Sequence, residues 1–374
     1  MTSRIVSIQI LRGIAASLVV IAHVIEHPLP IDALPDWALI TGIFGVDIFF
    51  VVSGFVIVHI TGAGRFDPFG FAVRRVLRIV PLYWACTILT FVLVLTVPAA
   101  FKRTVADVPH VLASLAFVPH PDPLNPSDWR PLLKLGWSLN YEMFFYLLAA
   151  ATFWCRSAVR RAGLLTAALV PLIAASTVVA PNASLLAHYA NANLIGFVFG
   201  MWLAIGHRGG LFGGPGDKRV AATVLAAIAA VAATALLYGR PASGLGSLGG
   251  HLVMSVAAAA IVATGLFGEA WLRADRHSFA ERIGDWSYSL YLTHMFVVGA
   301  MAAAAGVAAR RWGIDGIAAQ IGFGVVTVAL SLAVAAVSYR LIEVPSQWLG
   351  RRIGRKPATD GHAIAVMGHG APVA

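Results

Sequence analysis

Charged residues are scarce in this chain of 374 residues, because Asp, Glu, Lys and Arg together make up only 12% of it. A soluble domain carries about 25%. Hydrophobic residues account for 59% of the chain, and its mean hydropathy is +0.81. This composition excludes a soluble globular protein and predicts an all-α fold, a polytopic bundle of membrane-spanning helices.

Cysteine and acidic residues are also few. Cys86 and Cys155 lie in or at the ends of apolar segments, which argues against a disulfide framework and against a cysteine-based metal site. The 17 acidic residues face 27 basic ones, and the pI is about 10.1. The basic residues cluster in short segments between apolar runs, without any pattern typical of nucleic-acid binding. We therefore attribute the excess of basic over acidic residues to membrane topology. We expect no metal site and no nucleic-acid partner.

About ten apolar segments are long enough to cross a bilayer. We predict spans at residues 5–25, 38–60, 78–97, 136–154, 163–181, 191–206, 219–238, 249–267, 285–306 and 317–339. If the N-terminus is cytoplasmic, 19 Lys and Arg residues lie in inside segments and seven in outside segments. This bias predicts that both termini are cytoplasmic.

The spans form one predicted membrane domain, residues 1–345, followed by a polar tail at 346–374 that we expect to be cytoplasmic and disordered. No further soluble domain is expected after the helices. The longest predicted external loop, residues 99–135, is rich in proline and aspartate, and could either cover a site or simply connect helices.

The first span contains two residues that are rare within a membrane, Arg12 and His23. They are 11 positions apart, or almost three helical turns, so both side chains leave one face of the helix about 16 Å apart. That face must contact protein or water. An imidazole can act as a general base near neutral pH, although a histidine hydrogen-bonded between helices fits the sequence as well.

Two acidic residues fall inside other predicted spans. Glu142, in WSLNYEMFFY, is about two turns below the outer surface, at the depth expected for His23, and could form a catalytic dyad with that histidine. A structural ion pair is the alternative. Asp47, in GVDIFFVVSGFVI, could neutralise Arg12 or support the site; we interpret the nearby Ser53 as a helix-packing residue.

Arg75 and Arg78 are three positions apart, on one helical face near the cytoplasmic interface, where two guanidinium groups suit a phosphate-bearing ligand. From charge alone, an ordinary topogenic basic loop that also contacts anionic lipid is the better explanation. Two further residues could support a site: His294, within WSYSLYLTH, and Glu343, within YRLIEVP near the cytoplasmic interface.

Taken together, these motifs resemble the acyltransferase-3 family of membrane proteins. The matching segments occur in the family's order from Arg12 to about Pro345: LRGIAASLVVIAHV, GVDIFFVVSGFVI, RRVLRIVPLYW, WSLNYEMFFYLL, GDWSYSLYLTH and YRLIEVP. Arg12 and His23 match the family's Arg-x10-His element, Arg75 and Arg78 match its Arg-x-x-Arg element, and Glu142 matches the Glu of WSL-x-x-E. The chain looks most like members that acetylate secreted exopolysaccharide.

The resemblance implies an O-acetyltransferase of the bacterial inner membrane that uses cytoplasmic acetyl-CoA as co-substrate, with no tightly bound cofactor. The acceptor would be a hydroxyl of an extracytoplasmic polysaccharide or of its lipid-linked precursor. His23 would be the general base or a transiently acylated residue, Glu142 would orient it, and Arg12, Arg75 and Arg78 would hold the donor.

Two alternatives remain. Internal His, Arg, Asp and Glu residues also suit a transporter or flippase for glycolipids or small acids, and an acyltransferase with a non-glycan acceptor would contain the same donor site. Membrane lipids are expected partners in every case. The oligomeric state is open.

Overall fold

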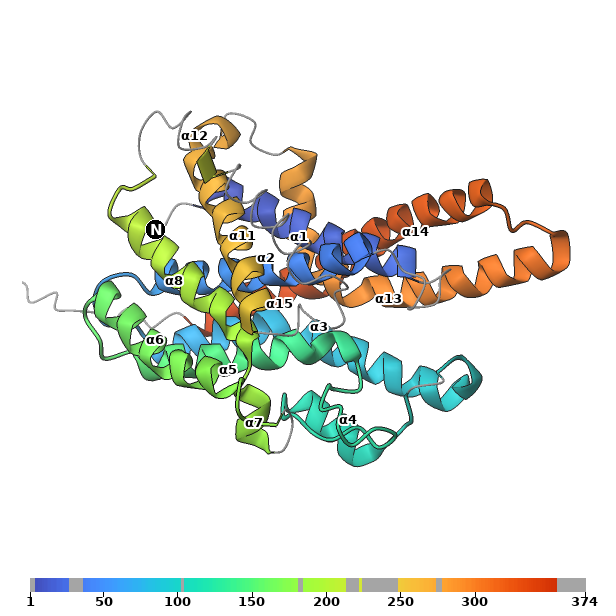
Figure 1. Cartoon of the computed structure of the whole chain (residues 1–374), viewed down its shortest axis with the longest axis horizontal. Helices are drawn as coiled ribbons and strands as arrows, with labels where there is room; N and C mark the ends of the chain where they lie inside the picture. The colour runs from blue at the N-terminus through green and yellow to red at the C-terminus, as the bar shows by residue number, and fades with distance from the viewer. Residues whose placement is uncertain are drawn as a thin grey trace, which may run out of the picture.

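The computed structural model describes residues 4–26, 36–101, 104–180, 184–212, 222–223, 248–273 and 278–354. Within these ranges the regular structure is entirely helical, without strands, which confirms the predicted all-α fold. Figure 1 shows a bundle whose longer helices run mainly along the long axis of the molecule.

The main α-helices are α1 (Val6–Glu26), α2 (Asp36–Thr61), α3 (Pro68–Thr96), α4 (Val108–Leu115), α5 (Trp137–Ala151), α6 (Ala158–Ala175), α7 (Leu185–Tyr189), α8 (Ile195–Arg208), α11 (Leu248–Phe267), α12 (Glu269–Leu272), α13 (Phe279–Trp312), α14 (Ile317–Ser338) and α15 (Val344–Ile353). A π-helical segment, Tyr339–Glu343, joins α14 to α15. Short 3₁₀ turns occupy Pro98–Ala100, Lys134–Gly136 and Ala192–Leu194.

Seven helices within the described ranges are long and apolar enough to span a membrane, namely Val6–Glu26, Ile40–Thr61, Pro68–Thr96, Ala158–Ala175, Leu248–Phe267, Phe279–Trp312 and Ile317–Ile353. The chain is therefore a multi-pass membrane protein. Two predicted spans, 136–154 and 191–206, correspond to the shorter helices α5 and α8, of 15 and 14 residues. The predicted span 219–238 lies almost entirely outside the described residues.

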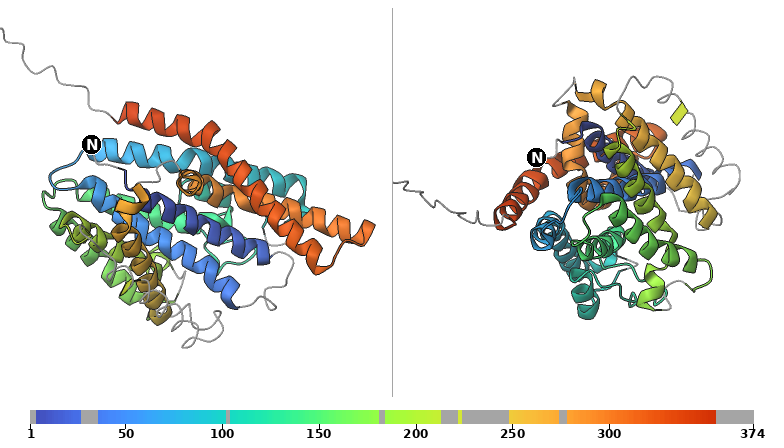
Figure 2. Two further views of the ribbon diagram at one scale, coloured as in Figure 1. Left: turned by 90° about the horizontal axis from the view of Figure 1, so that it is seen from above. Right: turned by 90° about the vertical axis from the view of Figure 1, so that its left-hand side faces the viewer.

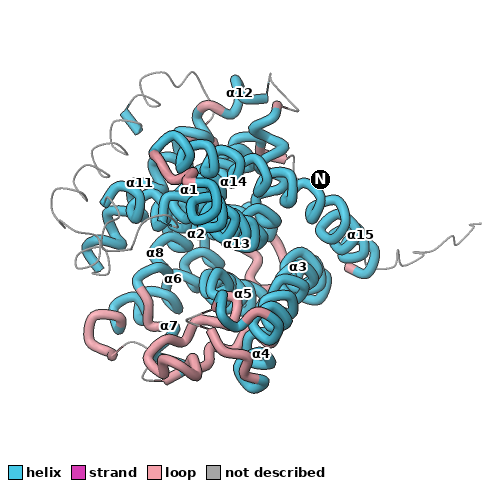
Figure 3. Tube along the Cα trace, turned by 90° about the vertical axis from the view of Figure 1, so that its right-hand side faces the viewer, coloured by secondary structure: helices cyan, strands magenta, loops and turns pink. Residues whose placement is uncertain are grey.

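Helix α1 lies near the centre of the bundle, packed between α2 and α13 (Figure 3). Its buried residues cover most of the helix surface and include Leu11, Ala15, Ala16, Val19 and Val20, whereas one narrow face carries the exposed Ile14 and Ile21. Most of the helix surface therefore faces protein rather than lipid. This position explains how α1 can carry polar groups at membrane depth.

Helix α14 has the opposite character. Its buried residues are Thr327, Ser331 and Ala335, which are spaced by four and form one stripe. Small and hydroxylated residues are typical of contacts between membrane helices. Apolar side chains such as Ile321 and Val325 are exposed on the rest of the surface, as expected for a lipid-facing helix. The ends of α13 and α14 project together from the bundle (Figure 1).

Helix α15 continues from α14 through the π-helical segment and lies beside the first turns of α3 (Figure 2). Arg74 of α3 donates a hydrogen bond from Nη1 to the carbonyl oxygen of Gly354, with a distance of 2.9 Å. The residues predicted to begin the tail, 346–353, are thus helical and packed. The rest of the predicted tail, from 355 to 374, lies outside the described residues.

Helices α2 and α8 approach each other closely at glycine residues. A Cβ atom on Gly200 would lie 1.9 Å from the carbonyl oxygen of Val51, and a Cβ atom on Gly54 would lie 2.2 Å from that of Phe197. Backbone atoms cannot move aside as a flexible side chain can. The contact therefore depends on the absence of a side chain at both positions.

We predict that Gly200→Ala lowers the free energy of unfolding by about 1–3 kcal/mol, because α2 and α8 must separate to admit the methyl group. The measurement is thermal unfolding of the protein in detergent. Gly163→Ala is the matched control, since nothing lies within 4 Å of a Cβ atom there. A similar loss of stability in both variants would contradict the packing argument.

Candidate active site

A polar cavity of about 130 Å³ lies in the centre of the bundle between α1, α2, α3, α5 and α13. Four residues predicted for the site, Arg12, Arg75, Arg78 and Glu142, line this cavity. Its other polar lining residues are Gln9, Ser53, Ser138, Tyr146, Tyr288 and Tyr291. We refer to it as the central cavity.

Three guanidinium groups face this cavity from two helices. Arg12 on α1 donates a hydrogen bond from Nη1 to Gln9 Oε1 at 3.1 Å. Arg75 on α3 lies over the rings of Phe71 and Tyr146, with its Cζ 5.9 and 5.6 Å from their centroids. Its Nε is buried and has no hydrogen-bond partner among the described residues. A buried donor of this kind is costly unless a ligand accepts from it.

Glu142 is held by two hydroxyl groups. Its Oε1 accepts a hydrogen bond from Ser53 Oγ at 2.9 Å and another from Tyr146 Oη at 2.5 Å. Tyr146 also contacts Arg75 through its ring. Ser53, interpreted from the sequence as a packing residue, is therefore a polar lining residue of the central cavity.

His23 lies outside the lining of this cavity, near the last turn of α1. Its Nδ1 is 2.9 Å from the carbonyl oxygen of Val19, and its Nε2 is 4.0 Å from Glu26 Oε2. Its ring contacts His294 edge-on, with centroids 5.2 Å apart. No hydrogen bond or ion pair joins His23 to Glu142 in the described part of the chain, so the predicted dyad is not formed.

The depth at which α5 begins explains why Glu142 does not reach His23. Tyr291 donates to the carbonyl oxygen of Leu135 at 2.9 Å and hydrogen-bonds Ser138 at 2.9 Å, so α5 begins beside Tyr291. Tyr291 is one turn along α13 from His294, or about 4 Å, and Glu142 is a further turn along α5, about 6 Å. Glu142 therefore lies about 10 Å deeper than the two histidines, closer to the level of Arg12.

His294 is fully buried between the central cavity and His23. Its Nδ1 bonds the carbonyl oxygen of Leu290 at 3.0 Å, and its Nε2 has no partner among the described residues. Its ring also approaches Tyr291, which lines the cavity, with centroids 6.3 Å apart. Tyr291 and His294 thus form a polar connection from the central cavity to His23.

Asp47 and Glu343 differ in their relation to the arginines. Asp47 is buried on α2 and faces Ser255 of α11, whose Oγ is 3.5 Å from Asp47 Oδ1; it does not line the central cavity or contact Arg12. Glu343 accepts hydrogen bonds from Ser289 N and Oγ at 3.0 and 2.5 Å. It lies within electrostatic range of Arg12 and Arg78.

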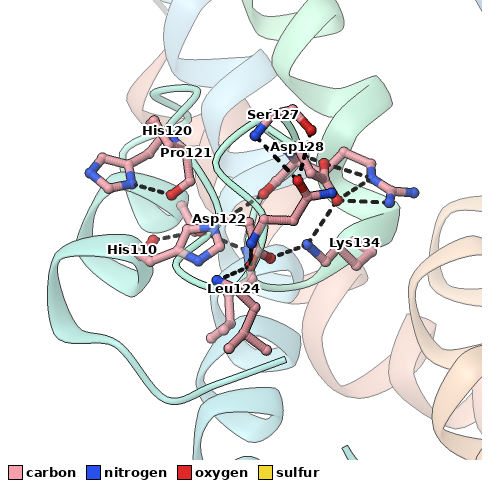
Figure 4. A network of polar contacts seen from close by, with 12 residues as sticks. His110, His120, Pro121, Asp122, Leu124, Ser127, Asp128 and Lys134 are labelled. Carbon is pink, nitrogen blue, oxygen red and sulfur yellow. Dashed lines mark hydrogen bonds and ion pairs between the residues drawn. The ribbon is translucent and has the colours of Figure 1, made fainter. Parts of the chain in front are cut away.

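The loop predicted to be external is held by an ion-pair cluster (Figure 4). Lys134 Nζ bonds Asp122 Oδ2 and lies 3.2 Å from Asp128 Oδ2, and Arg130 Nη2 is 2.8 Å from Asp128 Oδ2. His110 reaches the carbonyl oxygen of Arg130 at 3.1 Å. These contacts give the segment 107–134 a defined structure. Among the described residues, no group of three or more His, Cys, Asp and Glu side chains is placed to hold a metal ion.

Sequence reasoning missed Gln9, Ser53 and Tyr291 as lining residues. One signal was present in α2, where Val46, Phe49, Ser53 and Val56 recur at helical spacing and all line the cavity. Tyr291 belongs to a segment rich in Ser and Tyr, but its contact with Ser138 joins residues 153 positions apart. Such contacts depend on the packing of α13 against α5.

Residues 5–336 match the family described as an acyltransferase domain, and the chain belongs to this acyltransferase-3 family of membrane proteins. The fold and the polar cavity thus belong to a membrane acyltransferase.

Two relatives illustrate the range of the family. The exopolysaccharide production protein ExoZ of Rhizobium meliloti (strain 1021) is 32% identical over 271 residues, covering 70% of this chain and 78% of ExoZ. The acyltransferase MdmB of Streptomyces mycarofaciens is 24% identical over 394 residues, covering 96% of each chain. No solved structure matches the chain significantly.

The ion-pair cluster around Asp122 and Asp128 predicts a pH dependence. Burial acts to raise the pKa of Asp122 and Asp128, but hydrogen bonds from Lys134 and Arg130 outweigh it and hold both pKa values below the ordinary value of 3.8. The stabilisation is complete above pH 4 and is lost as the pH falls below it. We expect backbone amides at 118–134 to exchange hydrogen faster at pH 3 than at pH 6, after correction for intrinsic rates.

Lys134→Met should remove the part of this pH dependence that comes from Asp122, because Lys134 is the main partner of that carboxylate, whereas Asp128 keeps its hydrogen bonds from Arg130. Lys134→Arg is the control that keeps the charge. Unchanged protection at pH 3 in the wild type would contradict the assignment.

Proposed function

We propose that this protein is a membrane O-acetyltransferase. It moves an acetyl group from cytoplasmic acetyl-CoA to a hydroxyl of an extracytoplasmic polysaccharide or its lipid-linked precursor. The observation that carries the proposal is the convergence of Arg12, Arg75 and Arg78 on one central cavity. The relative ExoZ, whose name connects it with exopolysaccharide production, supports a glycan acceptor.

The positive charge of the central cavity supports its role as the binding site of the acyl donor. Three guanidinium groups and a single carboxylate line the cavity, so the lining carries excess positive charge. Coenzyme A carries phosphates, and guanidinium groups bind phosphate in two-pronged hydrogen bonds. Arg75 and Arg78 lie in the first turns of α3, at the predicted cytoplasmic end of the cavity. The phosphates would bind there, with the acyl arm extending towards Tyr291.

His23 is the proposed general base. Its Nδ1–H would donate to the carbonyl oxygen of Val19, which leaves the Nε2 lone pair free to accept a proton. The acceptor hydroxyl gives its proton to Nε2 and attacks the thioester carbonyl. The tetrahedral intermediate then collapses, the carbon–sulfur bond breaks, and the proton returns to the coenzyme A thiolate. His294 would position the His23 ring by its edge contact.

Glu142 has a different role in this proposal from the one expected from sequence. Its hydrogen bonds to Ser53 and Tyr146, together with its place on the cavity wall, suit a positioning residue that counterbalances the arginines. Glu343 would provide the second negative charge near Arg12 and Arg78. Both termini would be cytoplasmic, and the membrane would be a bacterial inner membrane.

The test of this function is transfer of radiolabelled acetyl groups by the purified protein in nanodiscs. Labelled acetyl-CoA is supplied with deacetylated extracellular polysaccharide, and label on the polysaccharide is counted. Label on the polysaccharide supports the proposal. Transfer only to non-glycan hydroxyl compounds would favour the alternative acceptor class, and movement of a glycolipid without use of acetyl-CoA would favour transport.

For the donor site, we predict that Arg75→Gln weakens acetyl-CoA binding by about 10-fold or more, as expected for loss of a buried charge-assisted hydrogen bond. Binding is measured by calorimetry in nanodiscs. Arg65→Gln is the control, because Arg65 is an exposed arginine near the same end of the bundle. Equal affinity for all three proteins would place the phosphates elsewhere.

For the base, we predict that His23→Gln lowers the transfer rate by about 100-fold or more, in the range typical of general-base catalysis, while acetyl-CoA binding stays within about threefold. His120→Gln, a change in the external loop, should leave the rate unaltered. Retention of full transfer activity by His23→Gln would refute the role of His23.

A further inference from the structure

A second polar cavity opens at the end of the bundle that carries the external loop. Its volume is about 720 Å³, and its wall comes from the external loop, α5, α7, the segment before α8, the end of α6 and the start of α11. Figure 3 shows α5, α6 and α7 beside the loops at this end. We call it the outer pocket.

Aromatic rings form one wall of the outer pocket. Trp129 stacks on His188 with centroids 6.3 Å apart and planes inclined by 21°, and His188 stacks on Tyr141 at 5.2 Å and 5°. Trp137 meets Tyr141 edge-on at 6.0 Å. The C–H groups of a sugar ring carry a small positive charge and pack well on the electron-rich face of an aromatic ring.

Amide and hydroxyl groups lie beside these rings. Asn191 Nδ2 donates to Tyr141 Oη at 2.9 Å, and Tyr141 Oη donates to the carbonyl oxygen of His188 at 3.0 Å. Asn191 Oδ1 accepts from the backbone of Asn193, whose own side chain lines the pocket. Groups that both donate and accept hydrogen bonds match the hydroxyls of a saccharide.

The charged residues of the outer pocket are already paired with each other. Arg130 bonds Asp128 through Nε and Nη2, at 2.9 and 2.8 Å, and Lys134 approaches Asp128 from the other side. Each carboxylate–guanidinium pair cancels most of its own field. The lining therefore favours an uncharged ligand, in contrast to the central cavity with its excess of arginine.

Helix α5 separates the two cavities. Trp137 and Tyr141, one turn apart, face the outer pocket, whereas Ser138 and Glu142 face the central cavity. Phe50 lines the central cavity and contacts Trp137 and Tyr141, with centroids 6.1 and 6.4 Å away. A single layer of side chains therefore lies between the pockets.

We infer that the outer pocket binds the acceptor, an uncharged saccharide segment, next to the donor cavity. The inference rests on the proposed acetyltransferase function and adds to it the chemical class of the acceptor and the residues that recognise it. Trp129 stacks on a sugar ring, and Asn193 hydrogen-bonds its hydroxyls. Ser138, which follows Trp137 and bonds Tyr291, connects this pocket to the route towards His23.

The experiment measures acetyl transfer in nanodiscs at saturating labelled acetyl-CoA. Deacetylated extracellular polysaccharide of the producing organism is separated by anion exchange into uncharged and acidic fractions, and each is titrated. We expect Trp129→Ala to raise the half-saturating concentration of the uncharged fraction about fivefold or more. The maximal rate and the KM for acetyl-CoA should stay within about twofold, as expected when only acceptor binding is changed.

Three further variants isolate the pocket. Trp129→Phe keeps an aromatic face and should restore most of the acceptor affinity. Asn193→Ala, which leaves the ring stack intact, should also weaken acceptor binding. Trp312→Ala is the matched control, because Trp312 ends α13 away from the pocket and is 65% exposed; it should behave as the wild type.

An unchanged half-saturating concentration in both Trp129→Ala and Asn193→Ala would overturn the inference. So would an equal effect of Trp312→Ala, or transfer to the acidic fraction alone. These outcomes would leave the proposed function standing, since the wild type would still transfer acetyl groups. Absence of transfer by the wild type to either fraction would contradict the proposed function itself.

Discussion

The gathering of three arginine side chains around one cavity inside an apolar bundle is the constraint on which the rest of this structure depends. A charged group at membrane depth costs at least ~2.5 kcal/mol, and more without polar neighbours. Polar and acidic neighbours offset this cost for Arg12, Arg75 and Arg78. Glu142 lies on the same cavity wall, and Glu343 is within electrostatic range of Arg12 and Arg78. The π-helical segment that carries Glu343, an unusual element often found at functional sites, belongs to the same arrangement.

The surrounding helices are arranged so that this polar centre does not face lipid. α1 is buried on nearly every side, α2 packs closely on α8 through glycine, and α14 presents only a narrow stripe of small residues to the bundle. Between the central cavity and the outer pocket lies the short helix α5, whose two faces have different chemistry. A cationic interior and an uncharged outer pocket suit a reaction whose anionic donor and polar acceptor come from opposite sides.

Much of this organisation could be predicted from the sequence, because its signals are local. Hydropathy and length predicted the all-α membrane fold. Charge within apolar segments singled out Arg12 and Glu142, and helical spacing singled out Arg75 and Arg78; all four line one cavity. The partner of Glu142 could not be predicted, because α5 begins deeper than a full-length span would. Asp47 was expected to neutralise Arg12 or to support the site, but on α2 it faces Ser255 of α11 instead.

We propose that this protein connects a donor on one side of the membrane with an acceptor on the other. The most direct measurement uses vesicles that contain the purified protein, with radiolabelled acetyl-CoA trapped inside and deacetylated polysaccharide outside. We expect label on the external polysaccharide, in intact vesicles and only when the protein is present. Label that appears only when acetyl-CoA and polysaccharide share one compartment would contradict it.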